Sequence, residues 1–191
     1  MAWLTKTEIE NLGFASVGNP VFLSDKAAFY NCEKIRLGHH VRIDDFCILS
    51  AGFGGIEIGN YVHLAVYCEL QGEGKIYMAD FSGLSARVSI YSDYEHCKGE
   101  MLAYSNLSED DFAGKHGDVI LHSQSGAGAG SVILPNVTLE YGSGCPTSTV
   151  IIENCKAFSG YFGVPARWAT ERKKTMLALE QQLREKLARD E

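Results

Sequence analysis

Aliphatic and small residues recur at every sixth position through the middle of this 191-residue chain. A weaker set opens the series at Val17, Leu23 and Phe29. A period of six matches neither an α-helix nor a simple alternating strand, and it predicts an all-β solenoid, the hexapeptide-repeat parallel β-helix. The main sets are Leu37, Ile43 and Leu49; Ile58, Leu64 and Leu70; Met78, Leu84 and Ile90; and Leu121, Ala127, Ile133, Leu139, Cys145 and Ile151.

Three such hexads make one triangular coil of a β-helix. Each hexad supplies a short strand and a corner, and its repeat residue points inward and stacks on the next coil at roughly 4.8 Å. One coil cannot bury its apolar side alone, so the coils must stack into a solenoid. Extra residues interrupt the period at 52–55 and 72–74, where glycine permits a wider corner. A larger polar interruption, 93–117, predicts an extended loop, and long loops of this kind are often functional.

Both ends of the chain predict helices. Thr5-Lys6-Thr7-Glu8 fits a capping box. Residues 166–188 have a helix-forming composition, and Pro165 stands just before them as a start signal. An apolar stripe on this helix is expected to pack on the solenoid or on a neighbouring subunit; it contains Met176, Leu179, Leu183 and Leu187. The predicted organisation is a lead-in over 1–15, the β-helix over 16–160 and a C-terminal segment over 161–191.

Composition limits the partners and the cellular location that we expect for the protein. The net charge of −7 argues against a nucleic-acid partner. No run approaches the roughly 18 apolar residues of a membrane span, and no signal peptide is visible. The six cysteines form no CxxC pair, and three of them fall on inward positions, so we expect free thiols and a cytoplasmic location.

The closing coils carry a specific resemblance. The run Gly128-Ala129-Gly130-Ser131-Val132-Ile133-Leu134-Pro135-Asn136-Val137-Thr138 resembles the last coils of hexapeptide-repeat (left-handed β-helix) acyltransferases. Gly163-Val164-Pro165-Ala166-Arg167 resembles the motif that ends their solenoid, and residues 41–46 and 81–92 are similar to the sugar O-acetyltransferase branch. The resemblance covers about residues 12–174. It implies a left-handed coil, a homotrimer, and acyl-CoA in a groove between neighbouring solenoids.

Transfer of an acyl group from a thioester needs a base, a donor for the oxyanion and a fixed position for CoA. Histidine suits the base because its pKa lies near neutrality. The resemblance places a catalytic histidine at the start of the long loop, where His96 stands, although a loop histidine without a role is an equal alternative. Glu95 or Asp93 is expected to orient the imidazole or to replace it. Arg87 and Tyr91 are predicted to bind the acceptor; for Arg87 a corner salt bridge is the alternative.

Two groups of residues are predicted to bind CoA. Gly128, Ala129, Gly130 and Ser131 are small enough for a ligand to approach their backbone, although corners need small residues anyway. Arg167, Arg172, Lys173 and Lys174 form a basic run that suits phosphate groups, with a solvated helix face as the alternative. The chain departs from the family at 123–127 and 144–146, where Ala127 and Cys145 predict a thin core beside an altered groove.

The resemblance implies an enzyme that uses acetyl-CoA and no metal. The leading hypothesis is acetylation of a sugar hydroxyl, on a cell-surface polysaccharide or a small saccharide. One alternative is N-acylation of an amino-sugar nucleotide, and a second is a non-catalytic assembly protein. A γ-type carbonic anhydrase is disfavoured because His116 and His122 are six apart and therefore lie on successive faces.

Overall fold

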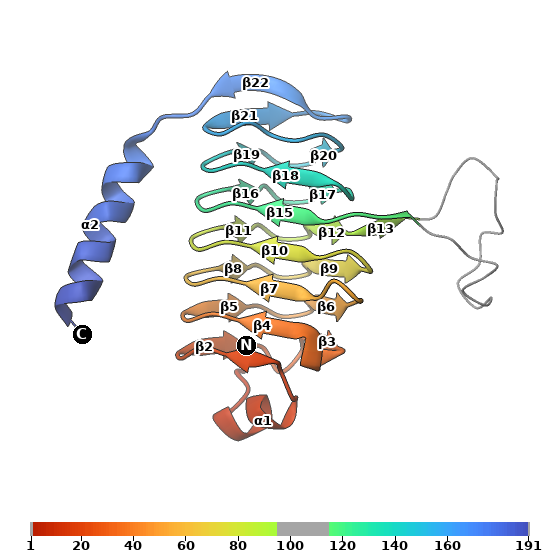
Figure 1. Ribbon diagram of the computed structural model, residues 1–191, viewed down its shortest axis with the longest axis vertical. Helices are drawn as coiled ribbons and strands as arrows, with labels where there is room; N and C mark the ends of the chain where they lie inside the picture. Colours follow the sequence, from red (N-terminus) through yellow and green to blue (C-terminus); the bar gives the residue numbers. More distant parts are fainter. Residues whose placement is uncertain (1, 95–114, 191) are drawn as a thin grey trace.

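The structure is a computed structural model that describes residues 2–94 and 115–190. Its main body is a parallel β-helix whose coils stack along one axis (Figure 1). The first sheet contains, in order, β1 (Ser16–Val17), β4 (Ile35–Leu37), β7 (Ile56–Ile58), β10 (Ile76–Met78), β15 (Val119–Leu121) and β18 (Val137–Leu139).

The second sheet carries the groove described below. It contains, in order, β2 (Val21–Leu23), β5 (Val41–Ile43), β8 (His63–Leu64), β11 (Gly83–Leu84), β16 (Gly126–Ala127), β19 (Gly144–Cys145), β21 (Ser159–Phe162) and β22 (Arg167–Glu171). The third sheet contains β3 (Ala28–Tyr30), β6 (Ile48–Ala51), β9 (Glu69–Gly72), β12 (Ser89–Tyr91), β17 (Val132–Ile133) and β20 (Val150–Ile151). A short antiparallel pair, β13 (Asp93–Tyr94) and β14 (Lys115–His116), flanks the long loop, and η1 (Cys32–Lys34) is a 3₁₀ turn.

The strand register confirms the hexapeptide prediction. Leu37, Ile58 and Met78 occupy equivalent positions on successive coils of the first sheet. Ile43, Leu64 and Leu84 do so in the second sheet, and all of the main repeat residues are buried. The opening set is weaker: Leu23 is fully buried, but Val17 is 37% exposed because β1 is an edge strand with one neighbour.

Corners of the β-helix carry ladders of side chains on residues with left-handed backbone conformations. At one corner the ring of Tyr61 stacks between His40 and Phe81, at centroid distances of 4.6 and 5.1 Å. At a second corner Phe46 stacks on Tyr67 at 5.0 Å. Non-glycine residues adopt positive φ only at a cost, and stacking between successive coils offsets part of it.

The N-terminal helix α1 (Lys6–Asn11) confirms the capping-box prediction. The Thr5 hydroxyl accepts from the Glu8 backbone N–H, and the Glu8 carboxylate accepts from the Thr5 N–H. The C-terminal prediction needs a correction. Residues 167–171 form β22, which pairs antiparallel with β21, and the helix α2 (Thr175–Asp190) begins only afterwards. Because β21 offers an open edge, pairing there outweighs the helical propensity of the segment.

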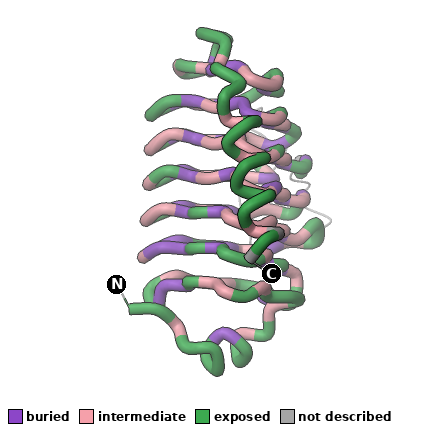
Figure 2. The backbone as a smooth tube through the Cα atoms, turned by 90° about the vertical axis from the view of Figure 1, so that its left-hand side faces the viewer, coloured by how far each residue is buried: buried purple, intermediate pink, exposed green. Residues whose placement is uncertain are grey.

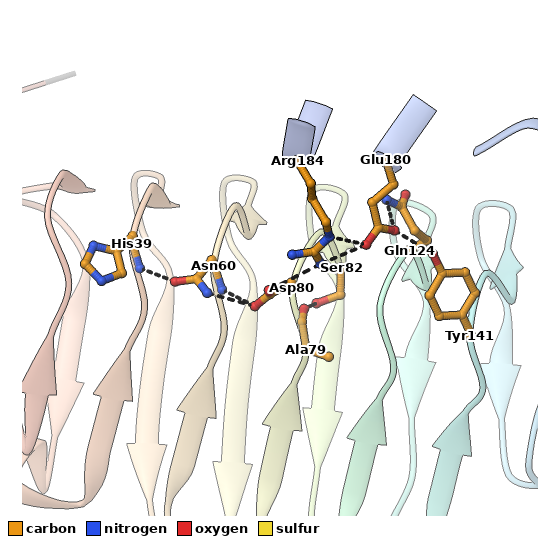
Figure 3. A network of polar contacts seen from close by, with 9 residues as sticks. All are labelled: His39, Asn60, Ala79, Asp80, Ser82, Gln124, Tyr141, Glu180 and Arg184. Carbon is orange, nitrogen blue, oxygen red and sulfur yellow. Dashed lines mark hydrogen bonds and ion pairs between the residues drawn. The ribbon is translucent and has the colours of Figure 1, made fainter. Parts of the chain in front are cut away.

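The helix α2 runs back along one side of the solenoid (Figures 1 and 2). Polar residues face the coils: Glu180 binds Gln124 and Tyr141, and Arg184 lies 3.6 Å from Asp80 (Figure 3). The predicted apolar stripe is only partly covered in the described chain: Met176 lies close to Gly142, whereas Leu179 is 64% exposed. In residues 2–94 and 115–190 no helix is long and apolar enough to cross a membrane.

Candidate active site

A shallow groove follows the outer surface of the second sheet. Its upper part, about 600 Å³ in volume, is lined by residues that include Gly126, Gly144, Pro146 and Arg172. Its lower part continues past Gly83 and Ser85 to His63. The groove therefore crosses several coils and is long enough to hold an extended ligand.

Glycine makes the floor of this groove. In each hexad the residue before the inward one points outward, because successive strand residues face opposite sides. On four successive strands of the second sheet that outward residue is glycine, at Gly83, Gly126, Gly144 and Gly160. These four residues, here called the glycine column, have no side chains of their own over about 14 Å of the sheet. The side chains of Arg172 and Thr170 lie close to Gly144 and Gly160, so the open part of the column is at Gly83 and Gly126.

The same column helps to explain the departures noted in the sequence. Inward of Gly126 and Gly144 lie Ala127 and Cys145, which stack above Leu84 and remain buried. The sheet therefore carries small side chains or none on both of its faces at this level. The two strands with small inward residues, at Ala127 and Cys145, therefore form the floor of the groove.

At the lower end of the groove, a buried carboxylate holds the side chains of an arginine and a histidine. Asp44 is 5% exposed; its carboxylate accepts from Arg42 Nε at 2.7 Å and contacts His63 Nε2 at 2.8 Å. Burial by itself raises the pKa of Asp44, but these two hydrogen bonds outweigh it and hold the pKa below its usual value. Asp44 therefore stays ionised and fixes both partners in place.

At the upper end of the groove, the four residues of the predicted basic run lie in four different environments. Arg172 lines the groove, and its Nη1 donates to the carbonyl of Gly142 at 2.6 Å. Lys174 lies over the ring of Phe158 at 5.0 Å, and Lys173 is exposed. Arg167 lies on β22, 4.0 Å from Glu153. Arg172 is thus the member of the run that reaches the groove.

The predicted small-residue segment lies at the corner beside the groove. Gly128 lines the groove, while Gly130 has a positive φ of 71° and donates its N–H to Ala86. Ala129 accepts from Ser148 through its carbonyl. Ser131 is fully buried, and its hydroxyl donates to the carbonyl of Pro146 and accepts from the Thr149 N–H. Its hydroxyl is therefore part of the coil packing.

The residues predicted around the long loop lie at another corner. Asp93 accepts from the Glu73 N–H at 3.2 Å and pairs with His116 across β13 and β14. Burial raises the pKa of Asp93, the Glu73 carboxylate raises it further, and His116 opposes the rise. A carboxyl with a raised pKa is a stronger base than an ordinary aspartate. Glu95 and His96 lie outside the described residues.

The two predicted acceptor ligands are engaged with neighbouring coils. The guanidinium of Arg87 lies over the ring of Tyr67 at 5.6 Å, so a cation–π contact takes the place of the corner salt bridge. The hydroxyl of Tyr91 donates to Glu69 at 2.9 Å. Burial, helped by Glu69, raises the pKa of Tyr91.

The groove and Asp93 lie on different sides of the solenoid. In Figure 1 the strands of the second sheet pass behind the left side, whereas β13 leaves the right-hand corner. Asp93 therefore does not face the glycine column of its own chain. No cluster of three or more potential metal ligands occurs within the described residues.

The chain resembles known proteins in both sequence and fold. No family model matches the chain. The chain is 43% identical over 188 residues to a dTDP-4-amino-4,6-dideoxy-D-glucose acyltransferase of Escherichia coli, with 94% of each chain covered. The chain belongs to the hexapeptide-repeat left-handed β-helix acyltransferases.

Solved structures support the same family assignment. AntD, an N-acyltransferase from Bacillus cereus solved with dTDP and 3-hydroxybutyryl-CoA, is 34% identical, with a TM-score of 0.93 and coverage of 97% of this chain and 98% of AntD. An AntD variant was solved with dTDP-4-amino-4,6-dideoxyglucose and coenzyme A. A maltose O-acetyltransferase from Clostridium difficile 630 shares the fold at 19% identity and a TM-score of 0.57, with 88% and 75% of the two chains covered.

These comparisons correct the functional hypothesis. Acetylation of a sugar hydroxyl was the leading expectation, and it is wrong, because the relatives at 43% and 34% identity act on an amino-sugar nucleotide or are N-acyltransferases. The likeness to the O-acetyltransferase is one of fold alone. Use of acyl-CoA as co-substrate is confirmed for the family.

Sequence reasoning missed two features of the groove. The glycine column was visible as Gly83-Leu84, Gly126-Ala127 and Gly144-Cys145, three glycines directly before inward positions. Arg42 and His63 occupy the same outward position on lower coils, but their link through Asp44 needs the folded register.

Proposed function

We propose that this acyltransferase moves an acyl group from acyl-CoA to the amino group of dTDP-4-amino-4,6-dideoxyglucose. The observation that carries the proposal is the 43% identity, over almost the whole chain, with an acyltransferase of that substrate. The AntD complex with the same amino sugar and coenzyme A supports it. The product is an amide-linked, dTDP-activated sugar.

The reaction forms a carbon–nitrogen bond and breaks the carbon–sulfur bond of the thioester. The neutral amine attacks the thioester carbonyl, the nitrogen loses a proton to a base, and the CoA thiolate leaves and takes up a proton. We propose Asp93 as the base because its raised pKa suits proton uptake. Glu95 and His96 stay candidates from the sequence. AntD variants with an aspartate replaced still hold dTDP and coenzyme A, which supports testing Asp93 by substitution.

The groove is proposed to hold acyl-CoA. The pantetheine arm is unbranched over most of its length and fits a surface without side chains, which the column offers at Gly83 and Gly126. Arg172 at the upper end suits the phosphate groups, with Arg167, Lys173 and Lys174 nearby in sequence. Gly128, Ala129, Gly130 and Ser131 form the corner beside it.

The proposed site combines two chains. Because Asp93 and the glycine column face different sides of one solenoid, a base and a thioester can meet only where two copies lie side by side. A closed homotrimer supplies such contacts with each copy contributing once to each site. We also propose a cytoplasmic location, which the five unpaired, buried cysteines of the described ranges support.

A thiol-release assay tests the function. Purified protein is mixed with acetyl-CoA or 3-hydroxybutyryl-CoA and with dTDP-4-amino-4,6-dideoxyglucose, and the free thiol and the amide product are measured. We expect turnover that requires the 4-amino group. The dTDP-sugar with a hydroxyl at that carbon is the matched control, and equal turnover with it would refute N-acylation.

A further inference from the structure

Below the glycine column, the outer surface of the second sheet changes character. The outward residues on β11, β8, β5 and β2 are, in descending order, Gly83, His63, Arg42 and Phe22. Large side chains thus replace glycine on three successive coils. Half-exposed aromatic and cationic groups in line with a ligand groove indicate a second binding surface.

Asp44 positions the side chains of Arg42 and His63 but leaves other nitrogens of both free for a ligand. Asp44 binds Arg42 through Nε and His63 through Nε2, so the buried carboxylate uses one nitrogen of each. Within residues 2–94 and 115–190, the terminal nitrogens of Arg42 and Nδ1 of His63 have no hydrogen-bond partner. Both side chains are about half exposed, at 48% and 49%. A fixed guanidinium with two open donors suits bidentate binding of phosphate oxygens.

Two aromatic rings lie beside the side chain of Arg42. Trp3 meets Phe22 edge-to-face at a centroid distance of 5.9 Å, and the guanidinium of Arg42 lies 5.4 Å from the Trp3 ring. The two rings are 37% and 43% exposed. Residues 2–4 are tied to β2 and its end by the Leu4 N–H to Leu23 carbonyl bond, so Trp3 has a defined position. A planar base can stack on such a surface.

We propose that Trp3, Phe22, Arg42 and His63 form the subsite for the nucleoside diphosphate of the acceptor. The inference rests on the proposed function. The base lies against Phe22 and Trp3, the diphosphate binds Arg42 and His63, and the sugar reaches Gly83 and Ser85. From Phe22 to Gly83 are three strand spacings, about 14 Å, the length scale of a nucleoside diphosphate with its sugar. The acceptor and acyl-CoA then enter one groove from opposite ends.

Separate titrations of dTDP and coenzyme A test this assignment. Calorimetric Kd values are measured for the wild type, Arg42→Gln and Phe22→Ala. We expect the Kd of dTDP to rise roughly tenfold or more in each variant, and that of coenzyme A to stay within about twofold. Thymidine is expected to lose affinity in Phe22→Ala, and inorganic pyrophosphate in Arg42→Gln.

Controls use the same substitutions on other faces of the β-helix. Arg36→Gln lies outward on the first sheet, and Phe53→Ala removes an 80% exposed ring at an inserted corner. Both are expected to bind dTDP like the wild type. Should Arg42→Gln unfold, Phe22→Ala decides the matter because its ring is partly exposed and its loss leaves the core intact.

Three outcomes count against the subsite. If dTDP affinity is unchanged in Phe22→Ala and in a folded Arg42→Gln, the assignment is wrong while the proposed function stands. If coenzyme A affinity falls instead, this end of the groove binds the CoA nucleotide and the assignment is overturned. If the wild type neither binds dTDP nor acylates its amino sugar, the proposed function fails and the subsite fails with it.

Discussion

Asp93 joins two properties that a catalytic base needs, a raised pKa and a position at the entrance of the long loop. The rise comes from burial and from the Glu73 carboxylate, while His116 opposes it. After the neutral amine has attacked the thioester, its nitrogen must lose a proton, so a carboxylate with a raised pKa fits N-acylation. In the groove, a single added methyl group is expected to have different consequences at Gly83 and at Gly126.

Asp93→Asn is expected to lower kcat by about 100-fold or more, because general-base catalysis contributes at least that much. The KM values for both substrates are expected to change little, since the amide keeps the shape of the side chain. Steady-state kinetics and circular dichroism check the result. Loss of folding in place of loss of turnover would assign Asp93 a structural role.

The acid side of the pH profile should follow the same carboxyl. Only the ionised form accepts a proton, so kcat/KM falls as the pH drops through the raised pKa of Asp93. Glu73→Gln removes a negative neighbour, lowers that pKa and moves the acid limb to lower pH. Glu57→Gln, on the first sheet, serves as the control. An unmoved limb in Glu73→Gln would contradict Asp93 as the titrating base.

Two glycines of the column predict opposite outcomes for stability. A Cβ on Gly126 would lie 2.7 Å from the Gly83 carbonyl oxygen, so Gly126→Ala is expected to cost about 1–3 kcal/mol. A Cβ on Gly83 meets its nearest atom, the His63 carbonyl oxygen, at 3.5 Å, so Gly83→Ala should fold normally. Thermal unfolding separates the two. In Gly83→Ala the methyl group enters the groove, and we expect a higher KM for acyl-CoA.

At the scale of elements, α2 is held by polar contacts rather than by its apolar stripe. Glu180 accepts from Gln124 and Tyr141, and Arg184 lies over Phe81 at 4.9 Å and beside Asp80 (Figure 3). Burial, helped by Glu180, raises the pKa of Tyr141 to about 12. Burial alone would raise the pKa of Glu180, but hydrogen bonds from Tyr141, Arg184 and Gln124 hold it below the usual value.

Acid should therefore release α2. The pKa of Glu180 is depressed in the docked helix, so its contribution is complete above the ordinary glutamate pKa and is lost as the pH falls through the docked value. Amide exchange of α2 is expected to accelerate in that range. Tyr141→Phe removes one donor and should weaken docking by about 1 kcal/mol at neutral pH. Exchange in β10 and β15 is the internal reference.

At the scale of the whole molecule, the proposed base and the proposed acyl-CoA groove lie on different sides of one solenoid, so the proposed site needs two copies of the chain. Asp93→Asn and Arg172→Ala remove groups from different sides of the solenoid. Mixed oligomers of the two variants should regain about a quarter of wild-type sites, because each interface draws its two sides at random. Activity is measured after joint refolding. Absence of any recovery in mixed oligomers would place the complete site within one chain.

The repeat and the family were predictable because they depend on local pattern. Inward positions recur with the strand register, so Leu37, Ile58 and Met78 could be placed before any fold was known. The C-terminal segment was not, since the open edge of β21 turned residues 167–171 into a strand. The acceptor was misjudged because O- and N-acyltransferases share one solenoid, and a fold does not specify a substrate.

The sequence by itself determined the coil architecture, the inward residues, the capping box of α1 and the use of acyl-CoA. The first three depend on spacing along the chain, and the use of acyl-CoA followed from the resemblance of the closing coils to the acyltransferase family. Tertiary structure decided the union of Asp44 with Arg42 and His63, the alignment of four glycines into one floor, and the polar face of α2. Apart from the Arg42–Asp44 bond, which lies within one coil, those contacts join residues on different coils or join α2 to the coils, and insertions of variable length at the corners set which residues meet.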